Sequence, residues 1–320
     1  MNQWTFPTKI YAGEDSLQRL TEFNNESILI ICDPFLKDSP NLTYVMSLMD
    51  SRNKVTIYTD VVPDPPITHV VKGIEFMEGI KPTVIIAIGG GSCIDMSKGI
   101  AYFGRKLKHM DIKSFIAVPT TSGTGSEVTS FAVLTDSETQ TKYPLVDDAV
   151  LPDEALLTPL FVKTSPPNVT AFSGMDVLVH ALEAYVATAA NNFTDALAQQ
   201  AIELVFEYLP KCHKPTATEH NRMSMHEASC LAGLSFNRAG LGIVHAMAHQ
   251  LGGQFHVPHG LANSMLLPYV IGFNCSRNPA VAKKYAHLSA KLGFAAHNAS
   301  EADKLAALIE AIVTLQHTLD

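Results

Sequence analysis

The sequence predicts an α/β domain with a parallel sheet, a Rossmann-like variant, followed by an all-helical domain. In the first half of the chain, short β-branched runs alternate with segments of helix length, an order typical of a parallel sheet covered by helices. In the second half, long Ala- and Leu-rich segments replace that alternation. We therefore expect two domains, one over residues 1–163 and a helical one over residues 164–320.

Four runs in the first half have the composition of strands that are buried on both faces. They are SILIIC (27–32), VTIY (55–58), TVIIAI (83–88) and SFIAVPT (114–120). Between them, THVVKGIEFMEGI (68–80) is expected to form a helix. The Pro- and Thr-punctuated stretch LTPLFVKTSPPNVT (157–170) precedes the helical segments DVLVHALEAYVATAA and DALAQQAIELVFEYL, so the domain boundary is expected within it.

Composition and charge narrow the class of protein. The chain has 320 residues, of which 47% are hydrophobic and 17% charged, which suits a globular protein with a large core. Its formal net charge is -8 and no Lys/Arg cluster could follow a phosphate backbone, so we expect no nucleic-acid partner. The longest apolar run is far short of the ~20 residues that span a bilayer, and the N-terminus lacks a secretory pattern. We therefore expect a cytoplasmic protein with no membrane partner.

A glycine-rich loop follows the third expected strand. The chain runs from TVIIAI through Gly90, Gly91 and Ser92 into an amphipathic helix. Glycines at a strand end let backbone N–H groups approach a phosphate, and Ser92 could cap the helix whose positive end would face the anion. The loop is neither GxGxxG nor GxxxxGK[ST], so a plain tight turn with a serine cap explains it equally well.

A second loop, VPTTSGTGSEVTS (118–130), follows the fourth expected strand and is rich in hydroxyl groups and glycine. Its hydroxyl residues include Thr120, Thr121 and Thr124. Two such loops at the carboxyl ends of parallel strands converge on one crevice, where open α/β sheets bind nucleotides. The pair of loops therefore favours a dinucleotide site in the domain at residues 1–163.

Asp33 ends the first expected strand and is a candidate for the cofactor ribose. A carboxylate there could accept hydrogen bonds from the ribose diol and repel a 2′-phosphate, which would select NAD. A turn aspartate before Pro34 is the simpler interpretation. In the ordinary fingerprint the acidic residue follows the glycine loop, whereas Asp33 precedes it, so we expect a variant wiring of the sheet.

Asp176 and the histidines of the second half are candidates for a metal site. Asp176 and His180 are four residues apart, as are His245 and His249, so each pair lies on one helix face. A carboxylate in an apolar helix is costly unless it is paired or binds a metal, and a hydrogen-bonded core pair remains the alternative. A donor set of one carboxylate and several imidazoles suits both Fe(II) and Zn(II). It does not distinguish between the two metals. His259 can join only through a turn after the helix of His245.

The chain resembles the iron-dependent (group III) alcohol dehydrogenases along essentially its whole length. The motifs that carry the resemblance are GGGSCIDMSK, PTTSGTGSEVT, GMDVLVHALEAY and GIVHAMAHQLGG followed by PHGLAN. Within the family, segments such as IICDPFL, NFTDALA and HQLGGQFHVPHGLAN are most similar to the 1-propanol dehydrogenases of propanediol-utilisation microcompartments. Family members continue with further helical sequence beyond Asp320, which implies that this chain lacks the end of its helical domain.

The resemblance implies roles for individual residues. It implies that His249 lies near the nicotinamide without binding the metal, that Lys142 contacts the cofactor ribose, and that His256 has no assigned role. The implied metal ligands are Asp176, His180, His245 and His259. The residues implied to hold the dinucleotide are Gly90, Gly91, Ser92, Thr120, Thr121 and Thr124.

The expected reaction is reversible hydride transfer between NAD(H) and a small primary alcohol or aldehyde, with propanal and 1-propanol as the first candidates. A bound Fe(II), or Zn(II), would polarise the substrate oxygen. A metal- and NAD-dependent lyase of the dehydroquinate-synthase kind is one alternative, and a catalytically silent protein that binds NAD and metal is another. We further expect a homodimer that associates with a bacterial microcompartment.

Overall fold

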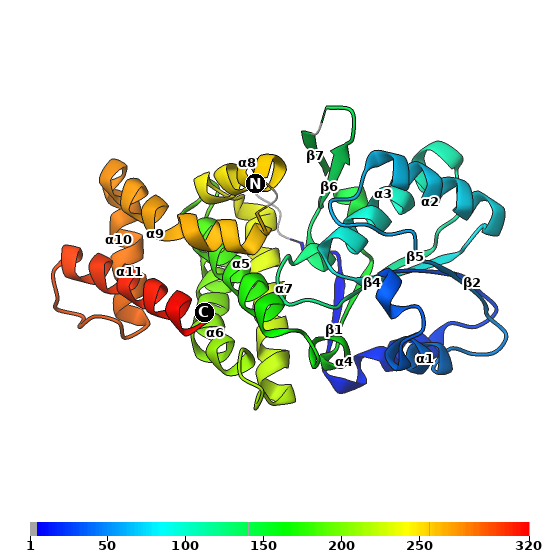
Figure 1. Cartoon of the computed structure of the whole chain (residues 1–320), viewed down its shortest axis with the longest axis horizontal. Helices are drawn as coiled ribbons and strands as arrows, with labels where there is room; N and C mark the ends of the chain where they lie inside the picture. The colour runs from blue at the N-terminus through cyan, green and yellow to red at the C-terminus, as the bar shows by residue number, and fades with distance from the viewer. Residues whose placement is uncertain (1–4, 140, 256, 320) are drawn as a thin grey trace. The chain divides into compact units, whose positions relative to one another are not determined.

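The computed structural model describes residues 5–139, 141–255 and 257–319. The chain forms two compact units, Met1–Ser165 and Pro166–Asp320 (Figure 1). We call them the sheet unit and the helical unit. Their roles as the cofactor-binding and metal-binding domains stay predictions.

The sheet unit is built on six parallel strands in the order β1-β8-β5-β4-β2-β3. The strands are β1 (Lys9–Ala12), β2 (Ser27–Cys32), β3 (Lys54–Tyr58), β4 (Val84–Gly89), β5 (Ser114–Pro119) and β8 (Glu154–Leu157). The prediction of a parallel sheet is therefore confirmed. The four predicted strands correspond to β2, β3, β4 and β5. Burial on both faces is wrong for β3, because β3 is an edge strand and most of its side chains are partly exposed.

The connections of the sheet create a switch point between two neighbouring strands. From β2 the chain moves outward to β3, whereas from β4 it moves the other way to β5, and β2 and β4 are hydrogen-bonded neighbours. The loops that leave such a pair diverge to opposite sides and open a crevice at the carboxyl edge. In this fold those loops begin with Asp33 and with Gly90.

Helices cover both faces of the sheet (Figure 1). The sheet unit contains α1 (Pro40–Ser47), α2 (Ile67–Ile80), α3 (Gly91–Lys108) and α4 (Pro159–Val162), with 3-10 helices η1 (Glu14–Glu22), η2 (Pro34–Leu36), η3 (Ser126–Val128) and η4 (Asp148–Val150). Alternate residues of β2 enter two different cores, since Leu29 packs with α2 and α3 while Ile30 packs with η1 and α1. This alternation is the period of a strand with two covered faces.

An antiparallel hairpin follows the second loop of the sheet unit. It consists of β6 (Phe131–Asp136) and β7 (Thr141–Val146) and forms a separate two-stranded sheet. This hairpin was not among the predicted elements, because β7 alternates little and contains Pro144. The hairpin carries Lys142.

The helical unit contains α5 (Pro167–Val186), α6 (Asn192–Cys212), α7 (Glu219–Ala239), α8 (Ile243–Phe255), α9 (His259–Arg277), α10 (Pro279–Lys291) and α11 (Glu301–Thr318). No strand occurs among the residues described after Ser165, so the prediction of a helical second half is confirmed. In the described part of the chain, every helix is too short or too polar to cross a membrane.

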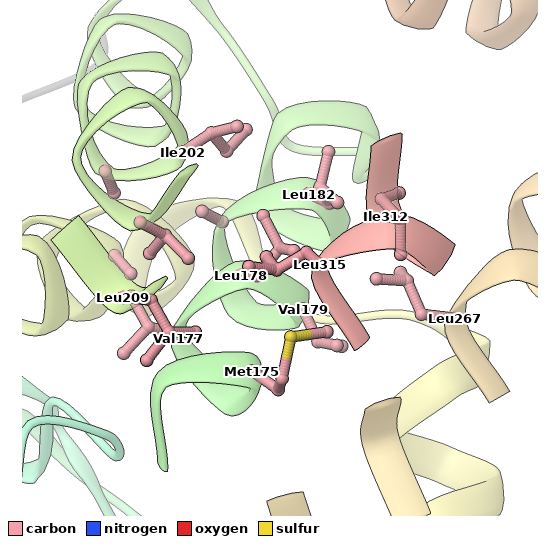
Figure 2. Packing of buried hydrophobic residues seen from close by; sticks show 14 of the residues in the cluster. Met175, Val177, Leu178, Val179, Leu182, Ile202, Leu209, Leu267, Ile312 and Leu315 are labelled. Atoms are coloured by element: carbon pink, nitrogen blue, oxygen red, sulfur yellow. The ribbon is translucent and has the colours of Figure 1, made fainter. Parts of the chain in front are cut away.

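Helix α5 is the centre of the helical unit. It is buried around most of its circumference, which explains why its sequence is apolar on every side. Figure 2 shows Leu178, Val179 and Leu182 of α5 packed near side chains of α6, α9 and α11. The residues labelled on those neighbouring helices are Ile202, Leu209, Leu267, Ile312 and Leu315. Polar groups carried by α5 are therefore placed inside a rigid apolar frame.

Candidate metal centre and dinucleotide loops

Asp33 and the first glycine loop meet at the switch point of the sheet. The Asp33 carboxylate, directly after β2, accepts a hydrogen bond through Oδ2 from the backbone N–H of Gly90, directly after β4, at 3.1 Å. Burial raises the pKa of Asp33, and the Gly90 hydrogen bond opposes that rise. The bond fixes the carboxylate at the edge where a dinucleotide is expected, and contact with a ribose stays a prediction.

The two loops lie against each other within the sheet unit. A Cβ atom added at Gly91 would approach Thr124 Cγ2 to 2.6 Å, and one at Gly90 would lie 3.6 Å from Thr121 Cγ2. The backbone N–H of Thr120 donates to the carbonyl of Gly89 at 3.0 Å. Gly91 therefore has no room for a side chain, and its backbone packs directly against the threonine loop.

Ser92 has a different role from the helix cap that the sequence suggested. The N-cap of α3 is Gly90 with no side-chain cap, and Ser92 lies in the first turn of the helix. Its hydroxyl instead accepts a hydrogen bond from the backbone N–H of Asp64 at 3.2 Å. Asp64 also forms an ion pair with Lys142, with 2.6 Å between Nζ and Oδ1. Asp64 thus links two residues that the family resemblance assigns to the cofactor.

A buried polar network behind the loops was missed from the sequence. Lys98 of α3 is fully buried, and its ammonium group donates to Thr129 Oγ1 at 3.1 Å and to the carbonyl of Phe131 at 2.6 Å. Asp95 lies 3.8 Å from the Lys98 ammonium and accepts a hydrogen bond from Ser126 at 2.6 Å. The network joins α3 to the C-terminal part of the second loop (118–130), which holds Ser126 and Thr129, and to the start of β6.

Glu127 is buried beside this network and interacts electrostatically with Lys98. Burial raises the pKa of Glu127 to about 7 and lowers the pKa of Lys98 to about 8, although the two charges favour each other. The sequence signal that could have revealed the network was the three-residue spacing of Asp95 and Lys98 in the first half of the amphipathic helix, which is otherwise mostly apolar or small there.

In the helical unit, one carboxylate and three imidazoles converge from three helices. The Oδ1 atom of Asp176 lies 3.9 Å from Nε2 of His180, 3.6 Å from Nε2 of His245 and 3.6 Å from Nε2 of His259. The four residues come from α5, α8 and α9. Asp176, His180 and His245 are buried, whereas the side chain of His259 is 37% exposed. All four predicted ligands are therefore brought together, with one open side at His259.

Burial and charge act in opposite directions on this cluster. Burial disfavours the ionised form of Asp176, but His180, His259 and His245 hold the pKa of that carboxyl well below its usual range. For His180 burial dominates and lowers the pKa to about 3, so the ring is neutral. Burial also opposes charge on His245, yet the Asp176 carboxylate, 3.6 Å from Nε2, and a hydrogen bond with a second carboxylate raise its pKa to about 9.

That second carboxylate is Glu183, which the sequence analysis missed. Its Oε2 accepts a hydrogen bond from Nδ1 of His245 at 2.6 Å, and its Oε1 accepts one from the backbone N–H of Val244 at 2.7 Å. A carboxylate only accepts, so Nδ1 is the donor and Nε2 is the atom that faces Asp176. Glu183 therefore sets the orientation of a ring carried by another helix.

Asn263, one turn after His259, was also missed. It is fully buried, and its amide nitrogen donates to Asp176 Oδ1 at 2.6 Å. The same nitrogen lies 3.2 Å from Nε2 of His245 and 3.1 Å from Nε2 of His259. The amide thus contacts three of the four predicted ligands.

His249 lies beside the cluster and outside its centre. Its ring centroid is 6.2 Å from that of His245, and it stacks on His259 with 5.2 Å between centroids. This position, next to the exposed side of the cluster, is compatible with the predicted role near the cofactor, which stays a prediction. His256 lies outside the described residues.

Close contact between two helices fixes where His259 stands. A Cβ atom at Gly260 would fall on the carbonyl oxygen of Phe172, in the second turn of α5. Because the obstacle is backbone, only glycine lets α9 begin so close to α5. His259 is therefore held within reach of Asp176 by the residue that follows it.

Comparison with known protein families shows which family the chain belongs to. A model of iron-containing alcohol dehydrogenases matches residues 7–159, and a model of the C-terminal part of the same family matches residues 170–320. The chain is also 47% identical over 316 residues to the 1-propanol dehydrogenase PduQ of Citrobacter freundii, covering 99% of this chain and 85% of that protein.

The chain belongs to the iron-containing alcohol dehydrogenase family. The resemblance inferred from the four motifs is thereby confirmed. The alternative of a lyase is not favoured.

Other iron-containing alcohol dehydrogenases share the sequence and the fold. The NADPH-dependent butanol dehydrogenase of Clostridium saccharobutylicum is 40% identical, with 100% of this chain and 84% of that protein covered. A solved 1,3-propanediol oxidoreductase is 32% identical with a TM-score of 0.91, covering 100% of this chain and 87% of that one. The sulfoacetaldehyde reductase of Bifidobacterium kashiwanohense, solved with NAD+, is 28% identical with a TM-score of 0.88, covering 100% and 86%.

The cluster fits the divalent cation that the name of the family implies. The candidate ligand atoms of Asp176, His180 and His245 all lie within 4.8 Å of one another. Among the described residues, Nδ1 of His180 has no hydrogen-bond partner, although it is buried. Three imidazoles and one carboxylate with an exposed fourth side are donors that iron and zinc both accept.

Proposed function

We propose that this metal-dependent alcohol dehydrogenase transfers hydride reversibly between NAD(H) and a small primary alcohol or aldehyde, with propanal and 1-propanol as its preferred pair. The observation that carries the proposal is the convergence of Asp176, His180, His245 and His259 on one point of the helical unit. The identity of 47% with a 1-propanol dehydrogenase supports the choice of substrate.

These four residues would hold the catalytic cation, which we propose is Fe(II), and the same donors accept Zn(II). When bound, a divalent cation acts as a Lewis acid that polarises an aldehyde oxygen or stabilises an alkoxide. His245 must be neutral to bind a metal, because only an unprotonated ring nitrogen is a ligand, and the two carboxylates that raise its pKa oppose that form until the cation binds.

The residues around the cluster prepare the site for hydride transfer. Glu183 holds His245 with Nε2 toward Asp176, and the buried walls of α5 keep water from the carboxylate. We propose that His249 accepts the alcohol proton and passes it to solvent, since imidazole is the side chain that most readily exchanges a proton near neutral pH.

In the sheet unit we propose that the two loops at the switch point bind the dinucleotide. The backbone of Gly90 and Gly91 would approach the pyrophosphate at the N-terminus of α3. The other residues of this proposed site are Asp33, Ser92, Thr120, Thr121, Thr124 and Lys142. The position of Asp33 at the edge between β2 and β4 supports a preference for NAD.

We further propose that the protein acts in the cytoplasm as a homodimer and associates with a propanediol-utilisation microcompartment. The similarity to the 1-propanol dehydrogenase PduQ supports this placement. Sedimentation of the purified protein, and its co-purification with isolated microcompartments, test the two statements separately.

One assay distinguishes the proposed reaction from its alternatives. The protein is loaded with Fe(II) under anaerobic conditions, and the absorbance of NADH is followed after propanal is added. Oxidation of NADH with formation of 1-propanol supports the dehydrogenase. Conversion of only a phosphorylated sugar acid would indicate the lyase, and binding of NADH and metal without turnover would indicate a silent protein.

A further inference from the structure

Asn263 stands in an unusual position for an amide. It is fully buried on α9, and its nitrogen is closer to Asp176 Oδ1, at 2.6 Å, than any of the three imidazole nitrogens is. No predicted role in the reaction required an amide there. The position is one turn after His259, so both side chains face α5.

The donor end of the amide faces the Asp176 carboxylate and the Nε2 atoms of His245 and His259, which accept a hydrogen bond in the unprotonated form that metal binding requires. Asp176 contributes a buried carboxylate oxygen, and Nε2 of His259 lies 3.1 Å from the amide nitrogen. Without a donor between them, electron-rich atoms would meet at short distance in an apolar interior, which is costly. An amide nitrogen carries two hydrogens and can serve two acceptors at once.

The acceptor end shows which interaction decides the orientation of the side chain. Among the described residues, Oδ1 of Asn263 is buried without a hydrogen-bond partner. A buried carbonyl left unpaired costs free energy, so this orientation persists only because the nitrogen gains more at Asp176. A reversed amide would place its oxygen against the Asp176 carboxylate, where the two would repel.

We propose that Asn263 is a positioning residue of the metal centre, which holds Oδ1 of Asp176 in place and keeps the ligand set assembled before the cation arrives. The inference rests on the metal site proposed above. It adds a residue that acts through Asp176 and need not touch the cation. Its loss should therefore weaken metal binding and alter the ligand field without removing a ligand.

Cobalt(II) is the probe, since its visible absorption reports the geometry of the ligands. We would compare the full chain with Asn263→Leu, which keeps the volume but has no donor, and with Asn263→Asp, which keeps the shape but offers only acceptors. Ser264→Ala is the matched control, because Ser264 is the buried neighbour on α9 and bonds Gln316, far from the ligands in the chain.

For Asn263→Leu we expect the Co(II) affinity to fall about 10- to 100-fold, the usual effect of losing a partner of a metal ligand, with a shifted absorption band. For Asn263→Asp we expect a lower Tm in the metal-free protein and a larger rise of Tm on adding Co(II) than in the wild type. Two carboxylates repel without a cation and attract one together. Ser264→Ala should keep the wild-type affinity and spectrum.

An affinity within twofold of the wild type together with an unchanged Co(II) spectrum in Asn263→Leu would overturn the proposal and leave Asn263 a packing residue. If Asn263→Leu does not fold, Asn263→Asp decides, and an unaltered metal-dependent rise of Tm in that variant would also overturn it. Failure of the metal site itself is recognised separately, because the wild-type chain would then bind no Co(II).

Discussion

At the scale of the residue, His245 and His249 share one face of α8 but have different surroundings. His245 is buried between two carboxylates, whereas His249 is one turn further along α8 and stacks on the partly exposed His259. These different surroundings support the proposed division, in which His245 binds the metal and His249 transfers a proton.

Replacing His249 tests that division. We expect His249→Ala to retain the metal and to lower kcat about ten- to a thousandfold, the range for losing one acid–base group. Metal content after dialysis and kcat across pH 6 to 9 measure the two effects. Loss of the metal would make His249 a ligand, and an unaltered kcat throughout this range would leave it a structural histidine.

Asp33 tests the choice of cofactor. Asp33→Asn keeps an oxygen for the Gly90 N–H but removes the charge that would repel a 2′-phosphate. We expect the wild type to prefer NAD at least about tenfold in kcat/KM, and the variant to narrow that ratio. Cofactor choice varies among the relatives, since one of them is an NADPH-dependent butanol dehydrogenase. If the wild type and the variant have equal ratios of kcat/KM for NAD and NADP, Asp33 does not contact the ribose.

At the scale of the element, two buried acidic residues each connect segments that are distant in the sequence. Glu183 of α5 receives hydrogen bonds from the first turn of α8, and its negative charge there also suits the positive end of that helix. Glu127, in the second loop (118–130), interacts electrostatically with Lys98 of α3. One connects helices of the metal cluster, and the other stands behind the dinucleotide loops.

Glu183→Gln should loosen His245 while leaving every ligand in place. The amide can still accept one hydrogen bond but lacks the charge that favours a donor at Nδ1. We expect the metal affinity to fall about 10- to 100-fold. Competition with a chelator of known affinity measures it, and Glu203→Gln on the exposed face of α6 is the control. An affinity equal to that of the control would show that the orientation of His245 is set elsewhere.

Glu127 makes the stability of the sheet unit depend on pH. Its pKa is about 7 in the folded chain against an ordinary 4.5, so the unfolded chain ionises first as the pH rises. The neutral Glu127 carboxyl makes its full contribution to the free energy of unfolding below pH 4.5. That contribution falls between pH 4.5 and about 7 and is lost at higher pH. Glu127→Gln stays neutral and should remove this fall, about 3 kcal/mol at most, since one pKa unit is about 1.4 kcal/mol.

Urea unfolding of the wild type and Glu127→Gln at pH 5 and pH 8 provides the measurement. Glu75→Gln on the exposed side of α2 is the control. If Glu127→Gln loses as much stability as the wild type between the two pH values, Glu127 is ionised in the folded chain.

At the scale of the whole molecule, each of the two units has its own core, and the proposed function assigns a different part of the chemistry to each. A cation held by residues of α5, α8 and α9 would stabilise only the helical unit directly. Binding to the folded state alone contributes about 4 kcal/mol when the free metal exceeds its Kd a thousandfold.

Metal removal tests this localisation. We expect chelation to lower Tm and to accelerate amide hydrogen exchange in α5, α8 and α9, with little change in β2, β4 and β5. Asp176→Ala should behave like the chelated wild type whether or not metal is added. Equal acceleration in both units, or a response of Asp176→Ala to metal, would contradict the assignment.

The sequence predicted the parallel sheet and the helical half because long apolar runs and helical spacing are local signals. It missed β1 and β8, which are four residues each and too short to show a period. Spacing and family resemblance brought forward the four candidate ligands. Glu183 escaped notice because its partner His245 lies 62 residues away, and the hydrogen bond of Asn263 to Asp176 spans 87 residues. The four-residue spacing of Asn263 from His259 was a local signal of its position.

Gly260 makes this protein sensitive to a substitution that is usually tolerated. In a population of natural variants, an alanine in place of glycine is normally among the mildest missense changes, and one outside any catalytic set attracts little notice. Here the added methyl group would collide with the peptide carbonyl of Phe172, which cannot rotate away as a side chain can. In a saturation library, position 260 should therefore be as intolerant as the ligands themselves, and a search for inactive alleles should recover it beside them.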